Sequence, residues 1–287
     1  MTLKSNFSLL NADYVKLNKN WNYQNVISPF YRLYLIDQGE GSVFNASKEY
    51  TLESGYLYLI PSFTICNHVC TNYLNQYYLH FIEESADGTS LFDSNRKIFK
   101  IPAIDTDYIL FQRILKLNPN RGLQSSDNPK EYEKQPILKG FQEKNLLLPL
   151  SAYVETQGIL LQFLARFLGL ENYQPTNAAN IPSKILQTIH YIQTHLQLPL
   201  TVEYLAEQVS LNSDYFSRLF YQYTGERPLP YIQQKRIERA QFLLITTDFP
   251  FSEIAAETGF ETVPYFYRIF KKITYQTPGE YKANHQF

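Results

Sequence analysis

The chain has 287 residues, of which 44% are hydrophobic and 18% are charged. This length and composition predict a globular protein of about two domains, each large enough for its own core. The formal net charge of −1 points to no particular class of partner. No apolar segment approaches about 18 residues, so no membrane span is expected. Polar Asn11 and Asp13 interrupt any export signal and the two cysteines fit a reducing compartment, which predicts a cytoplasmic protein.

The N-terminal half is predicted to be rich in strands. The first 25 residues, with the sole tryptophan Trp21, show no regular pattern and are expected to form an arm. The predicted strands are 31–36, 41–45, 49–52, 56–60, 65–69 and 76–82. Short strands separated by turn residues such as Gly39, Gly55 and Pro61 predict an antiparallel barrel or sandwich.

Side-chain alternation gathers polar residues on one face of each of two strands. These faces carry Cys66, His68 and Cys70 in the first strand and Gln76, Tyr78 and His80 in the second. Cysteine and neutral histidine bind zinc, so one interpretation is a metal site. The other is a barrel interior lined by small and aromatic residues. It is favoured because Cys-x-His-x-Cys on a strand is not an established zinc spacing, and we therefore expect no metal and no other cofactor.

Two helices are predicted after the strands. Residues 105–117 carry apolar side chains at helical spacing behind Asp105, a candidate N-cap, and the polar run 118–136 is expected to be a loop. Residues 151–170 form the second helix. Its apolar stripe consists of Tyr153, Val154, Leu160, Leu161, Leu164, Phe167 and Leu168. Such stripes usually pack into the core of their own domain.

One helical sequence pattern occurs twice in the C-terminal third of the chain. The first copy, 205–228, reads LAEQVSLNSDYFSRLFYQYTGERP, and the second, 254–278, reads IAAETGFETVPYFYRIFKKITYQTP. The starts of the copies match at an offset of 49, whereas the Tyr-Phe-x-Arg segments that begin at Tyr215 and Tyr265 match at an offset of 50. The second copy therefore has one extra residue in its turn. Such self-similarity indicates a duplicated structural unit.

Each copy predicts a short helix, a tight bend and a second helix, which together make a helix-turn-helix unit. The bend falls at Ser210 and at Gly259, where a left-handed backbone suits glycine better than serine. Asn212 and Thr262 are placed to cap the second helices. Apolar residues recur at three and four along these helices. The resulting buried stripes are Phe216, Leu219, Phe220 and Tyr223 in the first copy and Phe266, Ile269, Phe270 and Ile273 in the second.

The residues outside these stripes suggest DNA as the partner. In a helix-turn-helix unit the second helix enters the major groove, where arginine can bind guanine, glutamine can bind adenine and an apolar side chain can meet a thymine methyl. The outward residues are Ser213, Asp214, Ser217, Arg218, Tyr221 and Gln222 in the first copy and Val263, Pro264, Tyr267, Arg268, Lys271 and Lys272 in the second. The alternative is a pair of ordinary helical hairpins with hydrated faces. The duplication favours DNA.

Residues 230–246 predict one helix that connects the two copies. Its buried side carries Ile232, Ile237, Ala240, Leu243 and Leu244, and its basic side carries Lys235, Arg236 and Arg239. A stiff connector would hold the two reading helices at a fixed separation, and major-groove faces on one side of a duplex repeat every ~34 Å. Lys235 and Arg236 are therefore included among the predicted DNA contacts.

Residues 184–282 resemble the DNA-binding domain of the AraC/XylS family of bacterial transcription regulators. The matching segments are LAEQVSLNSDYFSRLF, KRIERAQFLL, IAAETGF and YFYRIFKK, followed by Pro278. The resemblance implies a unit that binds double-stranded promoter DNA through two recognition helices and acts with RNA polymerase. The chain departs from the family at Tyr221-Gln222, where a lysine pair is usual, and at Tyr275, where glycine is usual. From residue 181 onward ten Lys/Arg balance ten Asp/Glu, which predicts modest, salt-sensitive binding.

The strand-rich region is similar to the cupin-like ligand-binding domain common in that family, most visibly in LIDQGEGSV and SGYLYLIPSFTICNHV. The resemblance implies a pocket for a small-molecule effector such as a sugar. Its predicted wall consists of Gln38, His68, Tyr78 and His80, with Trp21 as a lid. The resemblance also raises the alternative that helix 151–170 pairs with its twin in a homodimer.

The predicted fold is α+β. A cupin-like antiparallel β-barrel with trailing helices occupies residues 1–170, a linker (ENYQPTNAANIPS) residues 171–183, and an all-α domain with two helix-turn-helix units and a connector helix residues 184–287. The predicted function is sequence-specific DNA binding that regulates transcription under control of an effector, with no catalytic residues. The alternative is a metal-dependent cupin-type enzyme with a helical appendage. It requires a metal triad, for which the sequence offers only scattered candidates, and neither H-E-x-x-H nor G-x-S-x-G occurs.

Overall fold

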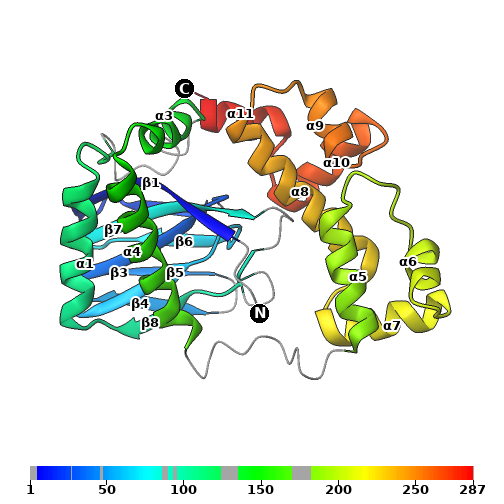
Figure 1. Ribbon diagram of the computed structural model, residues 1–287, viewed down its shortest axis with the longest axis horizontal. Helices are drawn as coiled ribbons and strands as arrows, with labels where there is room; N and C mark the ends of the chain where they lie inside the picture. Colours follow the sequence, from blue (N-terminus) through cyan, green and yellow to red (C-terminus); the bar gives the residue numbers. More distant parts are fainter. Residues whose placement is uncertain are drawn as a thin grey trace. The chain divides into compact units, whose positions relative to one another are not determined.

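The computed structural model describes residues 5–26, 28–45, 48–85, 90–92, 96–123, 135–169 and 182–286. The chain separates into two compact units, formed mainly by residues 1–84 with 96–173 and by residues 174–283, and each is described by itself (Figure 1). Most of the predicted linker, up to residue 181, lies outside the described residues. Within the described ranges, no helix combines the length and the apolar character needed to cross a membrane.

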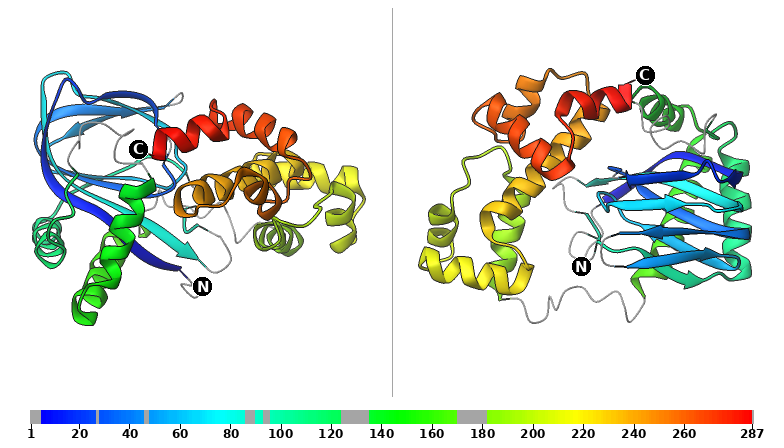
Figure 2. Two further views of the ribbon diagram at one scale, coloured as in Figure 1. Left: turned by 90° about the horizontal axis from the view of Figure 1, so that it is seen from above. Right: turned by 180° about the vertical axis from the view of Figure 1, so that it is seen from behind.

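The first unit is an eight-stranded, cupin-like β-barrel, which confirms the predicted fold (Figure 2). Its strands are β1 (Ser5–Asn18), β2 (Asn22–Val26), β3 (Tyr31–Phe44), β4 (Glu49–Glu53), β5 (Tyr56–Ile60), β6 (Cys66–Val69), β7 (Tyr73–Ser85) and β8 (Phe99–Pro102). One layer has the order β1-β7-β3-β5-β8, and β3 continues into a second layer with β4, β6 and β2. The β2–β6, β3–β4, β3–β5, β3–β6, β3–β7 and β5–β8 pairs are antiparallel.

Strand β3 belongs to both layers. Its first half pairs with β5 and β7, and its second half pairs with β4 and β6. The strand changes layer at a β-bulge between Ile36 and Gln38, followed by Gly39 with a φ of +76°. A Cβ atom on Gly39 would also lie 2.8 Å from the Tyr73 ring. The two strands predicted on either side of Gly39 are therefore a single bent strand.

The predicted N-terminal arm is wrong, because residues 5–18 and 22–26 form strands β1 and β2. Consecutive residues in the first half of β1, such as Leu9 and Leu10, are both fully buried, and helices α3 (Gln135–Leu146) and α4 (Leu150–Leu168) pack against this strand. A strand buried on both faces shows no alternation of polar and apolar residues, which is why the pattern was not visible. The four-residue strand β8 and helix α3 were missed as well.

Helices α1 (Asp105–Leu117) and α4 contact each other and β1 (Figure 1). The bounds of α1 are as predicted, but Asp105 is not its cap. Asp107 accepts a hydrogen bond from the Ile104 backbone N–H at 2.8 Å and forms an ion pair with Arg166 of α4. A buried carboxylate thus joins the two helices and also satisfies a free N–H at the start of α1.

The apolar stripe of α4 differs in part from the prediction. Leu160, Leu164 and Phe167 are buried as expected, together with Ile159 and Phe163. The predicted members Val154 and Leu161 lie on the exposed side of the helix. The difference arises because α4 is apolar around most of its circumference, so that spacing alone does not choose the buried side.

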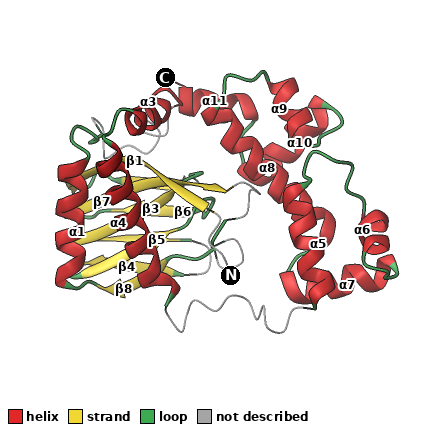
Figure 3. Cartoon of the chain, in the orientation of Figure 1, coloured by secondary structure: helices red, strands yellow, loops and turns green. Residues whose placement is uncertain are grey.

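The described elements of the second unit are all helices (Figure 3). They are α5 (Ser183–Thr194), α6 (Val202–Gln208), α7 (Ser213–Thr224), α8 (Pro228–Thr246), α9 (Phe251–Glu257), α10 (Val263–Thr274) and α11 (Pro278–Gln286). Helices α5 to α7 enclose a core around Phe216 and Phe220, to which α8 contributes Ile232. Phe266 and Phe270 lie at the centre of a second aromatic cluster, in ring contact with Phe260 and Tyr281. Helix α8 connects the two clusters.

Candidate nucleic-acid interface and ligand pocket

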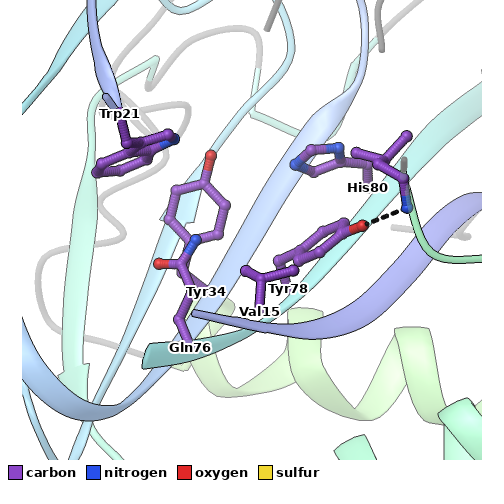
Figure 4. Close-up of a pocket in the computed structure, with 7 residues that line it drawn as sticks. Val15, Trp21, Tyr34, Gln76, Tyr78 and His80 are labelled. Carbon is purple, nitrogen blue, oxygen red and sulfur yellow. Dashed lines mark hydrogen bonds between the residues drawn. The ribbon is translucent and has the colours of Figure 1, made fainter. Parts of the chain in front are cut away.

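A small cavity lies inside the barrel of the first unit (Figure 4). It is lined by Val15, Trp21, Tyr34, Gln76, Tyr78, His80 and Leu123. These residues come from β1, the turn before β2, strands β3 and β7, and the segment after α1. The space open to the centre of a water molecule is about 10 Å³, which is about enough for a single water.

Two polar side chains from β7 define the chemistry of this cavity. Gln76 is 3% exposed, and its Oε1 atom has no hydrogen-bond partner among the described residues. The Tyr78 hydroxyl accepts a hydrogen bond from the Leu123 backbone N–H at 3.2 Å, and burial raises the pKa of this phenol. The wall therefore offers neutral polar groups, and a buried acceptor such as the Gln76 oxygen favours a molecule that donates a hydrogen bond to it.

The structure divides the predicted pocket residues into two groups. Trp21, Tyr78 and His80 line the cavity, whereas His68 lies behind the Trp21 ring, with centroids 4.8 Å apart. Gln38 is exposed and accepts a hydrogen bond from Asn75, so its prediction as a wall residue is wrong. The β-bulge after Ile36 shifts the alternation of β3 and turns Gln38 outward.

The histidines of the barrel are buried as neutral side chains. Burial holds the pKa of both His68 and His80 well below the ordinary value, and the charge of fully buried Arg32 acts in the same direction. Arg32 lies with Nη1 at 3.5 Å from His68 Nε2 and donates from Nη2 to the Thr64 carbonyl at 3.0 Å. Charging either ring would place a second cation beside this guanidinium without the solvation of water.

The sulfur atoms near His68 do not form a metal ligand set. Cys66 Sγ lies 3.6 Å from His68 Nε2, but Cys70 Sγ faces the Glu40 carbonyl at 3.9 Å. Over the ranges that the structure describes, no three His, Cys, Asp or Glu side chains are grouped closely enough to hold a metal ion.

In the second unit the two sequence copies adopt the same backbone geometry. After α6, the N–H groups of Ser210 and Leu211 donate to the carbonyls of Glu207 and Ala206 at 2.9 Å each. The corresponding bonds after α9 run from Gly259 to Ala256 and from Phe260 to Ala255, at 2.9 and 2.8 Å. The bend residues Ser210 and Gly259 both have positive φ, +52° and +76°, as their positions predict. Each copy is thus a helix-turn-helix unit.

The reading helices α7 and α10 begin at the predicted caps. Asn212 accepts from the Asp214 N–H at 2.9 Å, and Thr262 accepts from the Tyr265 N–H at 3.3 Å. The turn before α10 contains one more residue than the turn before α7. Both helices end in a left-handed residue, Gly225 after α7 and the exposed Tyr275 after α10.

All twelve residues predicted to face outward from these helices are exposed or half-buried. Their charges are unequal. Helix α7 carries Asp214 and Arg218, which cancel, whereas α10 carries Arg268, Lys271 and Lys272 and no acidic residue. The cationic surface is therefore concentrated on the second reading helix.

The connector helix positions the arginine of α10 through a tyrosine. Gln233 of α8 donates from Nε2 to the Tyr265 hydroxyl at 2.7 Å. The Arg268 guanidinium lies 5.1 Å from the centroid of the same ring. A cation over an aromatic face is held by about 0.5–1 kcal/mol at an exposed site. Arg268 is thus presented at the surface with part of its rotamer freedom already removed.

Two predicted DNA contacts on the connector are wrong. Lys235 and Arg236 are each only 9% exposed. Lys235 pairs with Glu238 at 3.3 Å and lies over the Tyr231 ring. Arg236 donates to backbone carbonyls of Leu196 and Leu198. Both cations are therefore bound within the unit and not available to DNA. The prediction placed them on an exposed basic side, but other helices surround α8 over most of its circumference.

The second unit also matches known proteins in sequence. Residues 205–284 match the family model described as "Helix-turn-helix domain". The xylose operon regulatory protein of Escherichia coli (strain K12) is 31% identical over 98 residues, 34% of this chain and 25% of that protein. The arabinose operon regulatory protein of the same strain is 32% identical over 102 residues, 35% of each. The chain thus carries a helix-turn-helix domain of the AraC type. It spans about a quarter to a third of these curated relatives.

A likeness in fold extends beyond the AraC-type domain. The structure of ToxT from Vibrio cholerae matches 98% of this chain and 100% of that chain, with a TM-score of 0.55 and 14% sequence identity. At this identity the likeness shows the fold alone. It includes the cupin-like barrel of the first unit.

Four wall residues of the cavity were not predicted, among them Tyr34 of β3. Val15 and Leu123 lie in segments expected to be irregular, so the sequence offered no signal for them. Gln76 shares the inward face of β7 with Tyr78 and His80, and the alternation that placed these two residues inside would also have identified Gln76.

Acid should destabilise the barrel because of the buried histidines. The folded-state pKa of His68 and of His80 is lowered, so below about pH 6.5 the unfolded chain binds more protons than the folded chain. We expect the free energy of unfolding to be level between pH 7 and 8 and to fall below about pH 6.5, by up to about 1.4 kcal/mol per pH unit for each histidine. Urea unfolding followed by the fluorescence of Trp21, the sole tryptophan, measures this.

The double variant His68→Gln with His80→Gln should lose most of this pH dependence. His190→Gln, at an exposed histidine of α5, is the matched control and should retain it. Equal slopes for all three proteins between pH 5 and 6.5 would show that the barrel histidines are not responsible.

Proposed function

We propose that this protein is a transcription regulator that acts in the cytoplasm and binds promoter DNA through α7 and α10 under the control of a small molecule bound in the barrel. The observation that carries the proposal is the pair of N-capped, outward-facing reading helices, which follow turns with the same pattern of backbone hydrogen bonds. The match of residues 205–284 to a helix-turn-helix family model and the similarity to operon regulators support it. In this proposal residues 184–287 bind DNA and contact RNA polymerase, and residues 1–170 bind the effector and a second subunit.

The two reading helices have different parts in this proposal. Lys271 and Lys272 at the end of α10 bind phosphates, and Arg268 reaches a base edge, where a bidentate contact to guanine contributes about 1–3 kcal/mol of discrimination. Helix α7 reads with the neutral residues Ser213, Ser217, Tyr221 and Gln222 and with one charge of each sign, Asp214 and Arg218. Helix α10 adds Val263, Pro264 and Tyr267. With most of the positive charge on one helix, binding is modest and sensitive to salt.

Substitutions on α10 should separate phosphate contacts from base contacts. The probe is a duplex enriched from a random-sequence pool by the full-length protein, and binding is measured by fluorescence anisotropy at several salt concentrations. We expect Lys271→Ala and Lys272→Ala each to weaken binding to all sequences and to lower the slope of log K against log[salt] by about 1. Arg268→Ala should instead reduce the preference for the enriched sequence.

Lys116→Ala, which removes an exposed lysine from α1 in the other unit, is the matched control and should bind like the unaltered protein. The proposal fails if the unaltered protein enriches no sequence from the pool at low salt, with or without candidate effectors.

The effector proposal rests on the cavity inside the barrel, whose wall includes residues of β3 and β7. Trp21, Tyr78 and His80 from the predicted set line it, and Gln76 contributes an unpartnered buried oxygen. Because the wall has neutral hydrogen-bonding groups and aromatic faces, it suits a small uncharged molecule with hydroxyl groups, such as a sugar. The present space accommodates about one water, so binding requires the side chains around it, Trp21 first among them, to move outward.

Ligand binding should therefore be visible in the fluorescence of Trp21. In a screen of neutral hydroxylated metabolites, we expect one class to change this fluorescence and to raise the melting temperature. At ~100 times the dissociation constant the stabilisation is roughly 2.7 kcal/mol. Gln76→Leu should abolish the response, whereas Gln38→Leu, the same change at an exposed glutamine, should not. An unchanged response of Gln76→Leu would exclude this cavity as the effector site.

The outer side of α4 suits a second copy of the chain. Leu150, Val154 and Leu161 share this side at spacings of four and seven and are 77%, 58% and 37% exposed. Apolar side chains gathered on one exposed face usually mark an interaction surface. A homodimer formed by pairing two α4 helices covers them.

Charging this face should therefore separate the subunits. Sedimentation equilibrium of the full-length protein should give a dimer that becomes a monomer in the double variant Val154→Glu with Leu161→Glu, because pairing would bury four carboxylates. Leu186→Glu on α5 changes an equally exposed leucine in the other unit and should leave the mass unchanged. A monomer in the unaltered protein at micromolar concentration would rule out this part of the proposal.

The cupin-type enzyme has less support than the regulator. The relatives reported above are named as operon regulatory proteins. In the barrel, His68 contacts Arg32 and Cys66, and Cys70 faces the Glu40 carbonyl. We propose that the barrel serves as a receptor without catalytic chemistry.

A further inference from the structure

One arginine joins three segments of the AraC-type domain. Arg236 projects from α8 and donates from Nε to the Leu196 carbonyl at 3.0 Å and from Nη2 to the Leu198 carbonyl at 2.6 Å. Both carbonyls belong to the segment between α5 and α6, at the entrance to the first helix-turn-helix unit. On the same guanidinium, Cζ lies 5.8 Å from the centroid of Phe260, in the turn of the second unit. Arg236 therefore contacts both copies from the connector.

The turn of the second copy approaches this arginine more closely than a side chain would permit. A Cβ atom on Gly259 would overlap the Leu196 carbonyl oxygen and lie 2.8 Å from Arg236 Nη2. Gly259 also has a φ of +76°. Glycine is thus required here both for its backbone conformation and for the absence of a side chain. The approach brings the turn of one copy directly against the first copy.

The first copy shows that the turn itself does not require this contact. Ser210 occupies the position equivalent to Gly259, with the same left-handed backbone and the same pattern of hydrogen bonds, and it is exposed. A serine is tolerated there because the position is exposed to solvent. Because the two turns share one conformation, the turn itself does not explain why one copy has serine and the other glycine. The glycine is explained by the packing of the second turn against residues 196–198.

The electrostatic surroundings of Arg236 come from the second copy as well. Burial lowers the pKa of the Arg236 guanidinium, and the charges of Tyr265 and Glu261 act in the opposite direction. Glu261 lies in the turn that has one residue more than its counterpart, so the longer turn of the second copy brings a carboxylate toward the buried cation. Tyr265 is the residue that also supports Arg268.

We propose that Arg236 is a positioning residue that fixes the orientation of the second helix-turn-helix unit relative to the first. It acts by locking the α9–α10 turn against the segment between α5 and α6, so that α7 and α10 face the DNA together. The rival explanation is that α8 is a rod stiff enough to set the orientation alone. The two explanations predict different results when the hydrogen-bond donors of Arg236 are removed while α8 remains helical. Only the first predicts that the second helix-turn-helix unit then changes its orientation relative to the first.

The proposal has a structural part that does not depend on DNA and a functional part that rests on the proposed function. Two helices that are free to rotate relative to each other bind two grooves with a loss of orientational entropy, whereas a locked pair has already lost it. Removing the lock therefore weakens simultaneous binding and relaxes the required spacing between half-sites. It does not alter the residues that contact bases.

The structural part is tested by a distance measurement in the full-length protein. Spin labels are attached at Gln222→Cys on α7 and Lys272→Cys on α10, both exposed, in a background in which the buried Cys66 and Cys70 are replaced by alanine. Double electron–electron resonance reports the distribution of distances between the labels. We expect one narrow distribution for the parent protein and a broad or displaced one for Arg236→Met, which keeps the aliphatic stem and removes the donors.

Matched variants distinguish loss of the Arg236 contacts from a general loss of folded structure. Arg239→Met changes an exposed arginine of the same helix and should leave the distribution narrow. Gly259→Ala should broaden the distance distribution even though Arg236 is intact. Gly225 has a φ of +78° and no atom within 4 Å of its Cβ position. Gly225→Ala therefore adds similar backbone strain without the overlap and should leave the distribution narrow. Circular dichroism of each variant establishes that α8 is still folded. A narrow, unshifted distribution for Arg236→Met, or loss of helix in both Arg236→Met and Gly259→Ala, would overturn the proposal.

The functional part uses the duplex enriched from a random pool by the unaltered protein, with one base pair inserted between the two half-sites. We expect the insertion to weaken binding by the unaltered protein about tenfold, the size of one lost bidentate base contact. For Arg236→Met, binding to the original duplex should be weaker and the penalty of the insertion should largely disappear. An undiminished insertion penalty would contradict the proposal while leaving DNA binding established. Enrichment of no duplex by the unaltered protein would instead refute the proposed function, and the distance measurement would still decide the structural part.

Discussion

The close approach of Gly259 to the Leu196 carbonyl is the contact on which the geometry of the second unit depends. Without a side chain at this position, the turn between α9 and α10 packs against the entrance of the first helix-turn-helix unit, and Arg236 closes the joint with two hydrogen bonds to carbonyls. The equivalent position in the first copy is exposed and carries serine. A duplicated sequence thus produces an asymmetric structure, because one copy is the support and the other is docked upon it.

The distribution of charge follows the same asymmetry. Ten basic and ten acidic residues from residue 181 onward cancel, and two of the basic ones, Lys235 and Arg236, are engaged in the interior. The cationic residues that remain on the reading helices lie mostly on α10. In the proposed function, such an arrangement makes α10 the main source of attraction to phosphates and leaves α7 to contribute through correct placement. Positional accuracy therefore matters more in such a domain than in one with a uniformly basic face.

The sequence predicts the helical unit well and the barrel only in outline, for physical reasons that individual residues make clear. Helix spacing, the caps Asn212 and Thr262 and the bends at Ser210 and Gly259 are local properties, and the structure shows all of them. The burial of Arg236 is not local, since it depends on carbonyls 38 and 40 residues away. Gln38 was misplaced because a single bulge reverses the alternation of a strand, and β1 was missed because its first half is buried on both faces.

The barrel interior limits how an effector could act. Its cavity has room for about one water, yet its wall contains the Gln76 oxygen, which has no hydrogen-bond partner among the described residues, and His80, which stays neutral because charging it is costly. A ligand that enters must displace aromatic side chains that are packed in the absence of ligand, and Trp21 connects the cavity to His68 and the second layer of strands. Binding can influence DNA recognition only to the extent that the ligand prefers one of two arrangements of the protein. A tightly packed, nearly closed cavity is suited to such a preference, because the open and closed packings of its wall are distinct states with no continuous range between them.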